Sequence, residues 1–335
     1  MRLLVTGGAG FIGSDFVRRM LGKHGDVEIV CFDKLTYAGN LDNLRDVADD
    51  SRYTFVRGDI CDRGAVEAAA EGVDAIVNFA AETHVDRSIA EPEAFLRTDV
   101  LGTHALLEVV RVRGIGRMVQ VSTDEVYGST EASAFVETDP LKPSSPYSAS
   151  KAGGDLQVLA YHTTFGLPVM ITRGSNTYGP YQYPEKLVPL FVTNALEGER
   201  LPLYGDGGNV RDWLHVDDHA DGIEFVLEHG EPGEVYNIGG GNERTNSQIA
   251  AVILDELGLT EDALEHVADR PGHDRRYALD CAKLRALGWA PRVDFEAGLR
   301  ETIRWYRDNA WWWERIKHDT DEFAAWRKRN YEGRG

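Results

Sequence analysis

A hydroxyl, two carboxylates, a phenol and an amine occur in one part of the chain, and these groups suit coupled oxidation and acid-base chemistry. Thr123, Asp124 and Glu125 follow one another, and Tyr147 and Lys151 lie four positions apart. On a helix, residues with that spacing share one face, so the Lys151 ammonium can favour the Tyr147 phenolate. A tyrosine ordinarily titrates near ~10, and a nearby cation helps the phenol to accept a proton at neutral pH. Together these residues predict oxidation coupled to elimination.

The residues before Tyr147 predict that it lies in the first turn of a helix. The run Pro143 to Pro146 supplies a serine cap and a proline for that turn. A Tyr-x-x-x-Lys spacing also occurs in ordinary amphipathic helices, so its meaning depends on the rest of the chain.

The N-terminal segment has the pattern of a dinucleotide-binding turn. Arg2 to Thr6 reads as a buried strand, and the glycines from Gly7 to Gly13 lead from it into the apolar helical segment Phe16 to Leu21. Glycines permit a tight turn and close approach of the backbone to a pyrophosphate, which binds the free N–H groups at the helix start. The glycines fit both a G-x-G-x-x-G and a G-x-x-G-x-x-G register.

The second strand favours NAD as the cofactor. Val27 to Phe32 is apolar and ends in Asp33, which follows Gly13 by 20 positions (33 − 13). An acidic residue there binds the adenosine ribose hydroxyls and repels the 2′-phosphate of NADP. The adjacent Lys34 leaves NADP open at this stage.

Further apolar runs alternate with helical segments, which is typical of a doubly wound parallel sheet. We therefore expect an α/β fold of the Rossmann type. The strand Tyr53 to Val56 leads into Asp59, which lies near the adenine or, alternatively, in a surface turn. The other expected strands are Ala75 to Ala81, Met118 to Val121, Pro168 to Thr172 and Gly233 to Ile238.

The order of these segments predicts two interleaved lobes. Residues 1–175 form the NAD-binding Rossmann domain, with return segments near residues 212–240. Residues 176–210 and 241–335 form a smaller substrate-binding lobe. The aromatic residues of its last part are expected to pack in the core; they are Trp305, Tyr306, Trp311, Trp312 and Trp313.

Composition limits the class of protein further. The 335 residues are 42% hydrophobic, which suffices for a large core. No segment reads as a membrane span, and glycines interrupt the N-terminal apolar run too early for a signal peptide. The three cysteines have no metal-ligand spacing. We therefore expect a cytoplasmic protein without a metal or a disulfide, and we interpret the basic run Arg327 to Arg329 as a solvated helix end, not a nucleic-acid site.

Taken together, these motifs resemble the extended short-chain dehydrogenase/reductases, and most closely the dTDP-glucose 4,6-dehydratases. The resemblance covers nearly the whole chain. Beyond the glycine turn, the Thr-Asp-Glu triplet and Tyr-x-x-x-Lys, it includes Ala80 to Ser88, Tyr178 to Gln182, Pro184 to Leu187, Tyr204 to Gly207, Val210 to His219 and Arg270 to Asp274.

The carboxylate pair separates this family from its neighbours. Removing the C5 proton of a 4-ketosugar needs a base, and expelling the C6 hydroxyl needs an acid. The resemblance implies that Asp124 is the acid and Glu125 the base. Sugar epimerases resemble the chain at Tyr147 and Lys151 but usually lack the pair, and nucleotide-sugar decarboxylases resemble it at Glu125 without an acid before it.

The mechanism implied by the resemblance converts dTDP-glucose to dTDP-4-keto-6-deoxyglucose and water. Tyr147 takes the C4 hydroxyl proton while hydride passes to NAD, Thr123 bonds the C4 oxygen, and Lys151 holds the ribose. Glu125 and Asp124 then eliminate water across C5 and C6, and the hydride returns to C6. The cofactor must stay bound and shielded from water throughout, which predicts a tight site.

The resemblance also implies two sets of binding residues. Those for the cofactor are Gly7, Gly10, Phe11, Ile12, Gly13, Asp33, Lys34, Leu35, Thr36, Asp59, Ile60, Ala80, Ala81, Thr98, Tyr147 and Lys151. Those for the substrate are His84, Thr123, Asn176, Lys186, Leu187, Pro202, Tyr204, Arg211, Asn246, Arg270 and His273.

The net charge of −19 opposes the binding of an anionic cofactor and an anionic nucleotide sugar. Local cations must therefore act at short range. We expect these cations to be Lys186, Arg211, Arg270, His273, Arg275 and Arg276.

Other implications of the resemblance stay open. A homodimer is expected through a four-helix bundle of segments Phe95 to Arg111 and Tyr147 to Phe165. Three positions depart from the family, namely Asp99, Thr177 and Asp15, of which the first two usually carry asparagine in relatives. An epimerase, a decarboxylase or a noncatalytic NAD-sensing protein remains the alternative, and thymidine is not distinguished from uridine.

Overall fold

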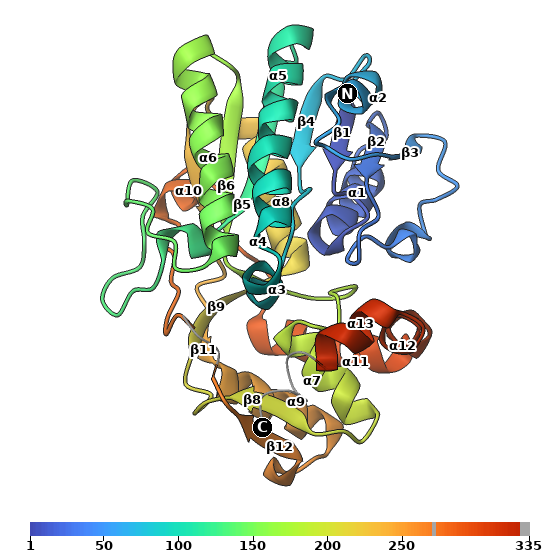
Figure 1. Cartoon of the computed structure of the whole chain (residues 1–335), viewed down its shortest axis with the longest axis vertical. Coiled ribbons are helices and arrows are strands. Elements are labelled where there is room, and N and C mark those ends of the chain that lie inside the picture. The colour runs from blue at the N-terminus through green and yellow to red at the C-terminus, as the bar shows by residue number, and fades with distance from the viewer. Residues whose placement is uncertain (270–272, 329–335) are drawn as a thin grey trace.

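The computed structural model describes residues 1–269 and 273–328 and shows two lobes, one above the other (Figure 1). The upper lobe is built on a seven-stranded sheet in the order β10-β6-β5-β4-β1-β2-β3. Every neighbouring pair in this sheet is parallel. The strands are β1 (Arg2–Thr6), β2 (Glu28–Asp33), β3 (Tyr53–Arg57), β4 (Ala75–Asn78), β5 (Arg117–Thr123), β6 (Val169–Gly174) and β10 (Val235–Ile238).

Helices cover both faces of this sheet, as a doubly wound fold requires. Helices α1 (Phe11–Lys23) and α8 (Val216–His229) share one apolar core with the sheet. Helices α2 (Arg63–Ala69), α5 (Thr103–Arg113) and α6 (Pro146–Phe165) share another core with the opposite face. The predicted α/β fold of the Rossmann type is confirmed.

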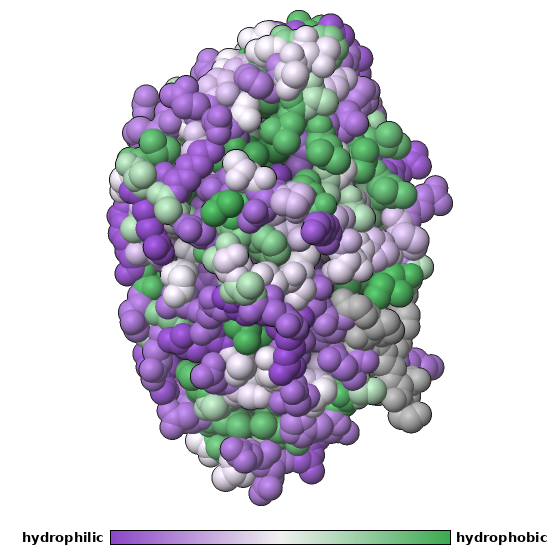
Figure 2. Space-filling view, turned by 90° about the vertical axis from the view of Figure 1, so that its left-hand side faces the viewer, coloured by the Kyte–Doolittle hydropathy of each residue, from purple (hydrophilic) through white to green (hydrophobic). Residues whose placement is uncertain are grey.

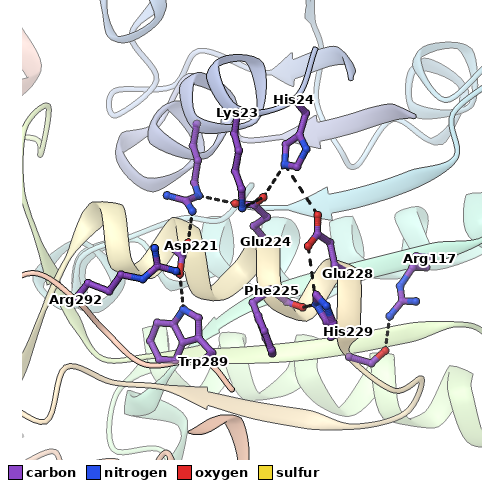
Figure 3. Close-up of polar contacts among 12 residues, drawn as sticks. Lys23, His24, Arg117, Asp221, Glu224, Phe225, Glu228, His229, Trp289 and Arg292 are labelled. Carbon is purple, nitrogen blue, oxygen red and sulfur yellow. Dashed lines mark hydrogen bonds and ion pairs between the residues drawn. The ribbon is translucent and has the colours of Figure 1, made fainter. Parts of the chain in front are cut away.

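Charged side chains join α1 to α8 (Figure 3). Lys23 and His24 reach Glu224 at 2.6 and 2.7 Å, and Arg19 reaches the same carboxylate at 2.5 Å. Burial acts to raise the pKa of Glu224, but these hydrogen bonds outweigh it and lower the pKa. His24, Glu224 and Glu228 also have the spacing of metal ligands. Because Glu224 is already neutralised by two cationic side chains, we interpret the group as a helix-helix ion-pair cluster.

Helix α6 begins where the sequence predicts. The Ser145 side chain accepts from the Ser148 backbone N–H, and the Ser148 hydroxyl accepts from the Ser145 N–H. Such a reciprocal cap satisfies two N–H groups that would otherwise lack partners. Pro146 occupies the first turn. The cap thereby fixes the start of the helix that carries Tyr147 and Lys151.

The lower lobe contains two small sheets and most of the chain after β6. Its strands are β7 (Asn176–Tyr178), β9 (Val210–His215) and β11 (Glu243–Thr245) in one sheet, and β8 (Leu201–Tyr204) and β12 (Leu264–Val267) in the other. Its helices are α7 (Leu187–Leu196), α9 (Asn246–Leu257), α11 (Phe295–Asp308), α12 (Ala310–His318) and α13 (Asp321–Arg327), around a third apolar core. Of the expected return segments, α8 and β10 pack in the upper lobe, while β9 pairs with β7 and β11.

Short elements connect the main ones. They are η1 (Leu41–Leu44), α3 (Val85–Ala90), α4 (Pro92–Phe95), the π-helix η2 (Leu96–Gly102), η3 (Asp124–Tyr127), η4 (Glu261–Ala263) and α10 (Ala282–Ala286). The described part of the chain contains no helix that is both long and apolar enough to cross a membrane.

Two expected elements differ from the observed ones. Strand β4 ends at Asn78, short of Ala81, because the Asn78 side chain accepts from the Ala80 N–H and turns the chain. The expected helix Phe95 to Arg111 consists of the end of α4, the wider turns of η2 and most of α5. Asp99 lies in the π-helical part, a deviation that is frequent at functional sites.

Candidate active site

The catalytic candidates meet at the carboxyl end of β5. Thr123 is the last residue of this strand, and Asp124 and Glu125 begin η3 directly after it. The Thr123 hydroxyl donates to Asp124 Oδ1 at 3.2 Å and accepts from the Glu125 N–H at 3.3 Å. The first bond orients the Asp124 carboxyl and the second fixes the Glu125 backbone, at the edge of the sheet where α/β proteins bind their ligands.

Lys151 is fixed by the same strand. Its Nζ donates to the Val121 carbonyl at 2.8 Å, and the side chain is buried. Tyr147 and Lys151 both line one cavity. The spacing of the two residues on α6 thus brings phenol and ammonium to the same site, as predicted.

The surroundings of Tyr147 nevertheless oppose its ionisation. Burial, followed by the charges of Glu125 and Asp99, raises the phenol pKa well above its usual value, and a hydrogen bond with Thr123 acts in the opposite direction. The prediction that the Lys151 ammonium favours the phenolate stays a prediction. Lys151 lines the same cavity as the phenol, and an oxidised nicotinamide ring would add a second positive charge there.

Asp124 has the environment of an acid. Its side chain is buried, and Oδ2 has no hydrogen-bond partner in the described part of the chain. Burial, together with the charges of Glu125 and Asp212, raises its pKa well above the usual value. Glu125 differs because it lines a cavity and is only partly buried. Two neighbouring carboxyls in unlike environments can divide the roles of acid and base.

A cavity of about 240 Å³ runs along the carboxyl edge of the sheet from the glycine turn to α6. All the predicted cofactor residues line it except Leu35, which packs against the core of the α1 face. The cavity fits a dinucleotide because the turn leaves no room for side chains. At Gly7, with φ +69°, a Cβ would lie 2.4 Å from the Ala80 nitrogen, and at Gly13 it would lie 2.4 Å from the Gly7 oxygen.

The acidic residue after β2 is held in place by backbone groups. Asp33 accepts from the Ala9 N–H at 3.0 Å and from the Leu35 N–H at 2.8 Å. Burial raises its pKa, although both bonds act against the rise. Lys34 pairs with Asp59 at 2.8 Å. Lys34 is the cation that could have bound the 2′-phosphate of NADP, and this ion pair engages it. The geometry therefore favours NAD.

The second cavity, of about 150 Å³, shares Tyr147 and Lys186 with the first. A substrate there would therefore meet the cofactor at Tyr147. Thr123 lines neither cavity, nor does Asp124, and Arg270 lies outside the described residues. The predicted substrate residues that line the second cavity are His84, Asn176, Lys186, Leu187, Pro202, Tyr204, Arg211, Asn246 and His273.

Only some of the expected cations contribute to this cavity. Lys186 Nζ donates to the Thr83 hydroxyl at 3.2 Å, and the Arg211 guanidinium lies 4.3 Å from the centre of the Tyr277 ring. Both side chains line the cavity. Arg275 and Arg276 do not line it and pair with Asp206 and Glu243 instead, so their role as local cations stays a prediction.

Several lining residues were not singled out from the sequence. Glu82, Thr83 and Glu185 lie within motifs quoted for the resemblance, which is the signal that could have found them. No sequence signal pointed to Trp312 and Ile316, because the aromatic run around Trp312 was interpreted as core packing. Asp86 and Trp213 also lie within quoted motifs, whereas Gly39, Asn40 and Tyr277 are lining residues without a sequence prediction.

The three departures have clear local roles. Asp15 pairs with Arg18 at 3.0 Å and does not line the cofactor cavity. The Thr177 hydroxyl bonds His219 Nδ1 at 2.7 Å. Asp99 accepts from the Ser150 hydroxyl at 2.5 Å and from the Glu82 N–H at 3.2 Å. Burial raises its pKa to about 6, although the Lys151 charge and the Ser150 bond oppose the rise.

This fold and site define the class of extended short-chain dehydrogenase/reductases. A family model described as GDP-mannose 4,6 dehydratase matches residues 4–302. The dTDP-glucose 4,6-dehydratase of Streptomyces niveus is 55% identical over 95% of this chain and 96% of its own. The enzyme of the same description from Streptomyces antibioticus is 57% identical over the same shares. The solved structure of DesIV, a dTDP-glucose 4,6-dehydratase from Streptomyces venezuelae with NAD and TYD bound, has a TM-score of 0.93 and 56% identity over 95% of this chain and 100% of that one. The chain belongs to the dTDP-glucose 4,6-dehydratase family.

Proposed function

We propose that this protein is an NAD-dependent hydro-lyase that converts dTDP-glucose to dTDP-4-keto-6-deoxyglucose and water. The observation that carries the proposal is the pair Asp124 and Glu125. One carboxyl is buried with a raised pKa, and the other lines the substrate cavity. An epimerase returns hydride to C4 and needs no such pair.

The redox half of the reaction centres on Tyr147, which lines both cavities. The chemistry that NAD supplies when bound is the acceptance of a hydride from C4 and its later return to C6. Tyr147 takes the proton of the C4 hydroxyl, and the Thr123 hydroxyl bonds the C4 oxygen. Lys151, anchored on the Val121 carbonyl, holds positive charge beside them.

The elimination half uses the two carboxyls. Oxidation at C4 acidifies the C5 hydrogen, and Glu125 removes it from within the substrate cavity. Asp124 donates its proton to the departing C6 oxygen. Asp124 lines neither cavity, and its Oδ2 has no hydrogen-bond partner in the described part of the chain, so we assign the transferred proton to this oxygen. Proton transfer by a placed side chain contributes ~10² to 10⁴-fold to the rate.

The two binding roles belong mainly to different lobes, although residues of both lobes line each cavity. We assign cofactor binding to residues 1–175 with the return segments near 212–240, and substrate binding to residues 176–210 and 241–335. Lys186, Arg211 and His273 surround the diphosphate and the nucleoside. The net charge is −19, but at physiological salt the repulsion from distant acidic groups is screened within ~8 to 10 Å. The nearby cations therefore dominate the field at the binding site.

The proposal includes a cytoplasmic homodimer joined through α5 and α6 of each copy. Figure 2 shows hydrophobic residues on the upper part of the face that α6 covers. Burying such side chains between copies would remove apolar surface from water. Exposed apolar residues on these and the preceding segments include Leu96, Leu101, Val112, Leu156 and Phe165. Light scattering of the purified protein tests the stoichiometry, and a monomer at micromolar concentration would contradict this part.

Incubation with dTDP-glucose and UDP-glucose, followed by mass analysis, tests the reaction. We expect the loss of one water from dTDP-glucose. An isomer of unchanged mass would indicate an epimerase, and no turnover of either sugar would favour an NAD-sensing protein. Loss of carbon dioxide from the corresponding C6 carboxylate sugar would indicate a decarboxylase.

A further inference from the structure

The wall of the cofactor cavity includes two side chains from the far end of the chain. Trp312 and Ile316 lie one turn apart on α12, and both line the cavity with the glycine turn. Trp312 is 2% exposed and Ile316 is 7% exposed. Figure 1 shows α12 and α13 below α1, at the boundary between the lobes. A helix of the substrate lobe thus closes part of the cofactor site.

Two hydrogen bonds tie α12 to the glycine turn. Trp312 Nε1 donates to Asn43 Oδ1 at 2.8 Å, and Asn43 Nδ2 donates to the Ala9 carbonyl at 2.9 Å. Asn43 is 1% exposed and Ala9 is fully buried. Ala9 lies among the glycines, and its N–H is bonded to Asp33. The chain of contacts therefore runs from α12 through Asn43 to the groups expected to hold the pyrophosphate and the ribose.

Charged pairs reinforce this connection at the surface. Arg315 of α12 pairs with Asp42 at 3.0 Å, and Glu322 of α13 pairs with Arg87 at 2.8 Å. Arg87 also pairs with buried Glu185 at 2.9 Å. These ties join α12 to Asp42 of η1 and α13 to Arg87 of α3, both in the first 175 residues.

We propose that residues 310–327 form a C-terminal clasp that retains the cofactor, with the Trp312–Asn43 bond as its inner contact. The inference rests on the proposed function, because the retained ligand is NAD. Hydride leaves C4 and returns to C6 only if the same cofactor molecule stays through the elimination. Release of NAD requires the clasp to separate from the upper lobe, which breaks the buried bond and both surface pairs.

The neighbouring Trp313 offers a matched control. It lies on the same helix, is 3% exposed, and donates through Nε1 to the Tyr306 carbonyl at 2.7 Å. That bond lies within the lower lobe, and Trp313 lines neither cavity. Trp312→Phe and Trp313→Phe therefore each remove one buried indole donor, but only the first cuts a tie to the upper lobe.

The rate of NAD release distinguishes the two variants without any turnover. Protein loaded with radiolabelled NAD is mixed with excess unlabelled NAD, and the label that stays bound is followed by rapid filtration. Loss of a buried donor that leaves its acceptor unpaired predicts roughly tenfold faster release from Trp312→Phe. Trp313→Phe should release NAD within about twofold of the wild-type rate. Equal release from both variants would overturn the proposal.

A surface variant keeps the test valid if Trp312→Phe does not fold. The double variant Arg315→Gln with Glu322→Gln removes both outer ties from exposed positions, and we expect release to be several-fold faster. Hydrogen exchange supplies a second readout, because bound NAD should slow exchange of the α12 amides. The clasp would be refuted if the double variant released NAD at the wild-type rate and if bound NAD did not change the hydrogen exchange of the α12 amides. A protein that binds NAD and dehydrates dTDP-glucose would still satisfy the proposed function.

Discussion

Replacing Asp124 by asparagine should separate the two halves of the reaction. Asparagine has nearly the same shape as a protonated aspartic acid, and its oxygen can still accept the bond that Thr123 donates to Oδ1. Proton removal by Tyr147 and oxidation of C4 by NAD should therefore continue. Elimination should slow, because the variant has no acidic proton to give to the C6 oxygen, and reduced cofactor should accumulate on the protein.

The size of the effect follows from the burial of Asp124. Burial and two nearby carboxylates raise the pKa of this carboxyl well above its usual value, which favours the protonated form that asparagine resembles. The folded protein should keep its stability to within about 1 kcal/mol, in the range of a substitution that breaks no buried partner. Loss of the acid should slow elimination by ~10² to 10⁴-fold.

Single-turnover absorbance of the reduced cofactor is the assay, with Glu125→Gln as the companion variant. Both variants should accumulate reduced cofactor. In deuterated water, sugar recovered from Asp124→Asn should carry deuterium at C5, because Glu125 still exchanges that position, whereas sugar from Glu125→Gln should not. Product formation by Asp124→Asn at the wild-type rate would remove Asp124 from the mechanism, and deuterium at C5 with Glu125→Gln would remove Glu125 as the base.

Two further predictions concern Asp33 and Asp99. Asp33→Ala should weaken binding of NAD much more than that of NADP, since ribose bonds are lost while repulsion of the 2′-phosphate is relieved; calorimetric titration measures both, and equal losses would mean that Asp33 does not recognise the ribose. Burial raises the pKa of Asp99 from 3.8 to about 6, so the folded state binds this proton more tightly than the unfolded state, and stability falls as pH rises through this window. Between about pH 5 and pH 7.5 the free energy of unfolding of the wild type should fall by on the order of 1 kcal/mol relative to that of Asp99→Asn, which lacks this ionisation. Urea unfolding at both pH values measures this difference between the two proteins. A difference that does not change with pH would contradict the raised pKa.

Local sequence patterns were sufficient to predict the cofactor-binding half of the fold. The glycine turn, Asp33 and the cap of α6 are each determined within a few residues, by φ values that favour glycine, by the end of a strand and by reciprocal serine bonds. Parallel order then brings the ends of β1, β2 and β5 to one edge of the sheet. Thr123, Asp33 and Gly7 lie at one site for that reason.

Other features depend on contacts between distant segments. Trp312 reaches the cofactor cavity only because the lower lobe folds back on η1, and nothing in an aromatic run distinguishes a cavity wall from a core. The pKa of Tyr147 depends on Asp99, which reaches α6 through the wider turns of η2. The ion pair of Arg275 with Asp206 joins residues that lie far apart in the sequence. Pairings of this kind leave no local signal in the sequence.

The path of the hydride tests the account most directly. With dTDP-glucose deuterated at C4, the deuterium should pass to NAD and return to the new methyl group at C6 while NAD stays bound. Mass and NMR analysis of the product should therefore find it in the methyl group, with a solvent hydrogen at C5. Deuterium retained at C4, or absent from the methyl group of turned-over product, would contradict the proposed reaction.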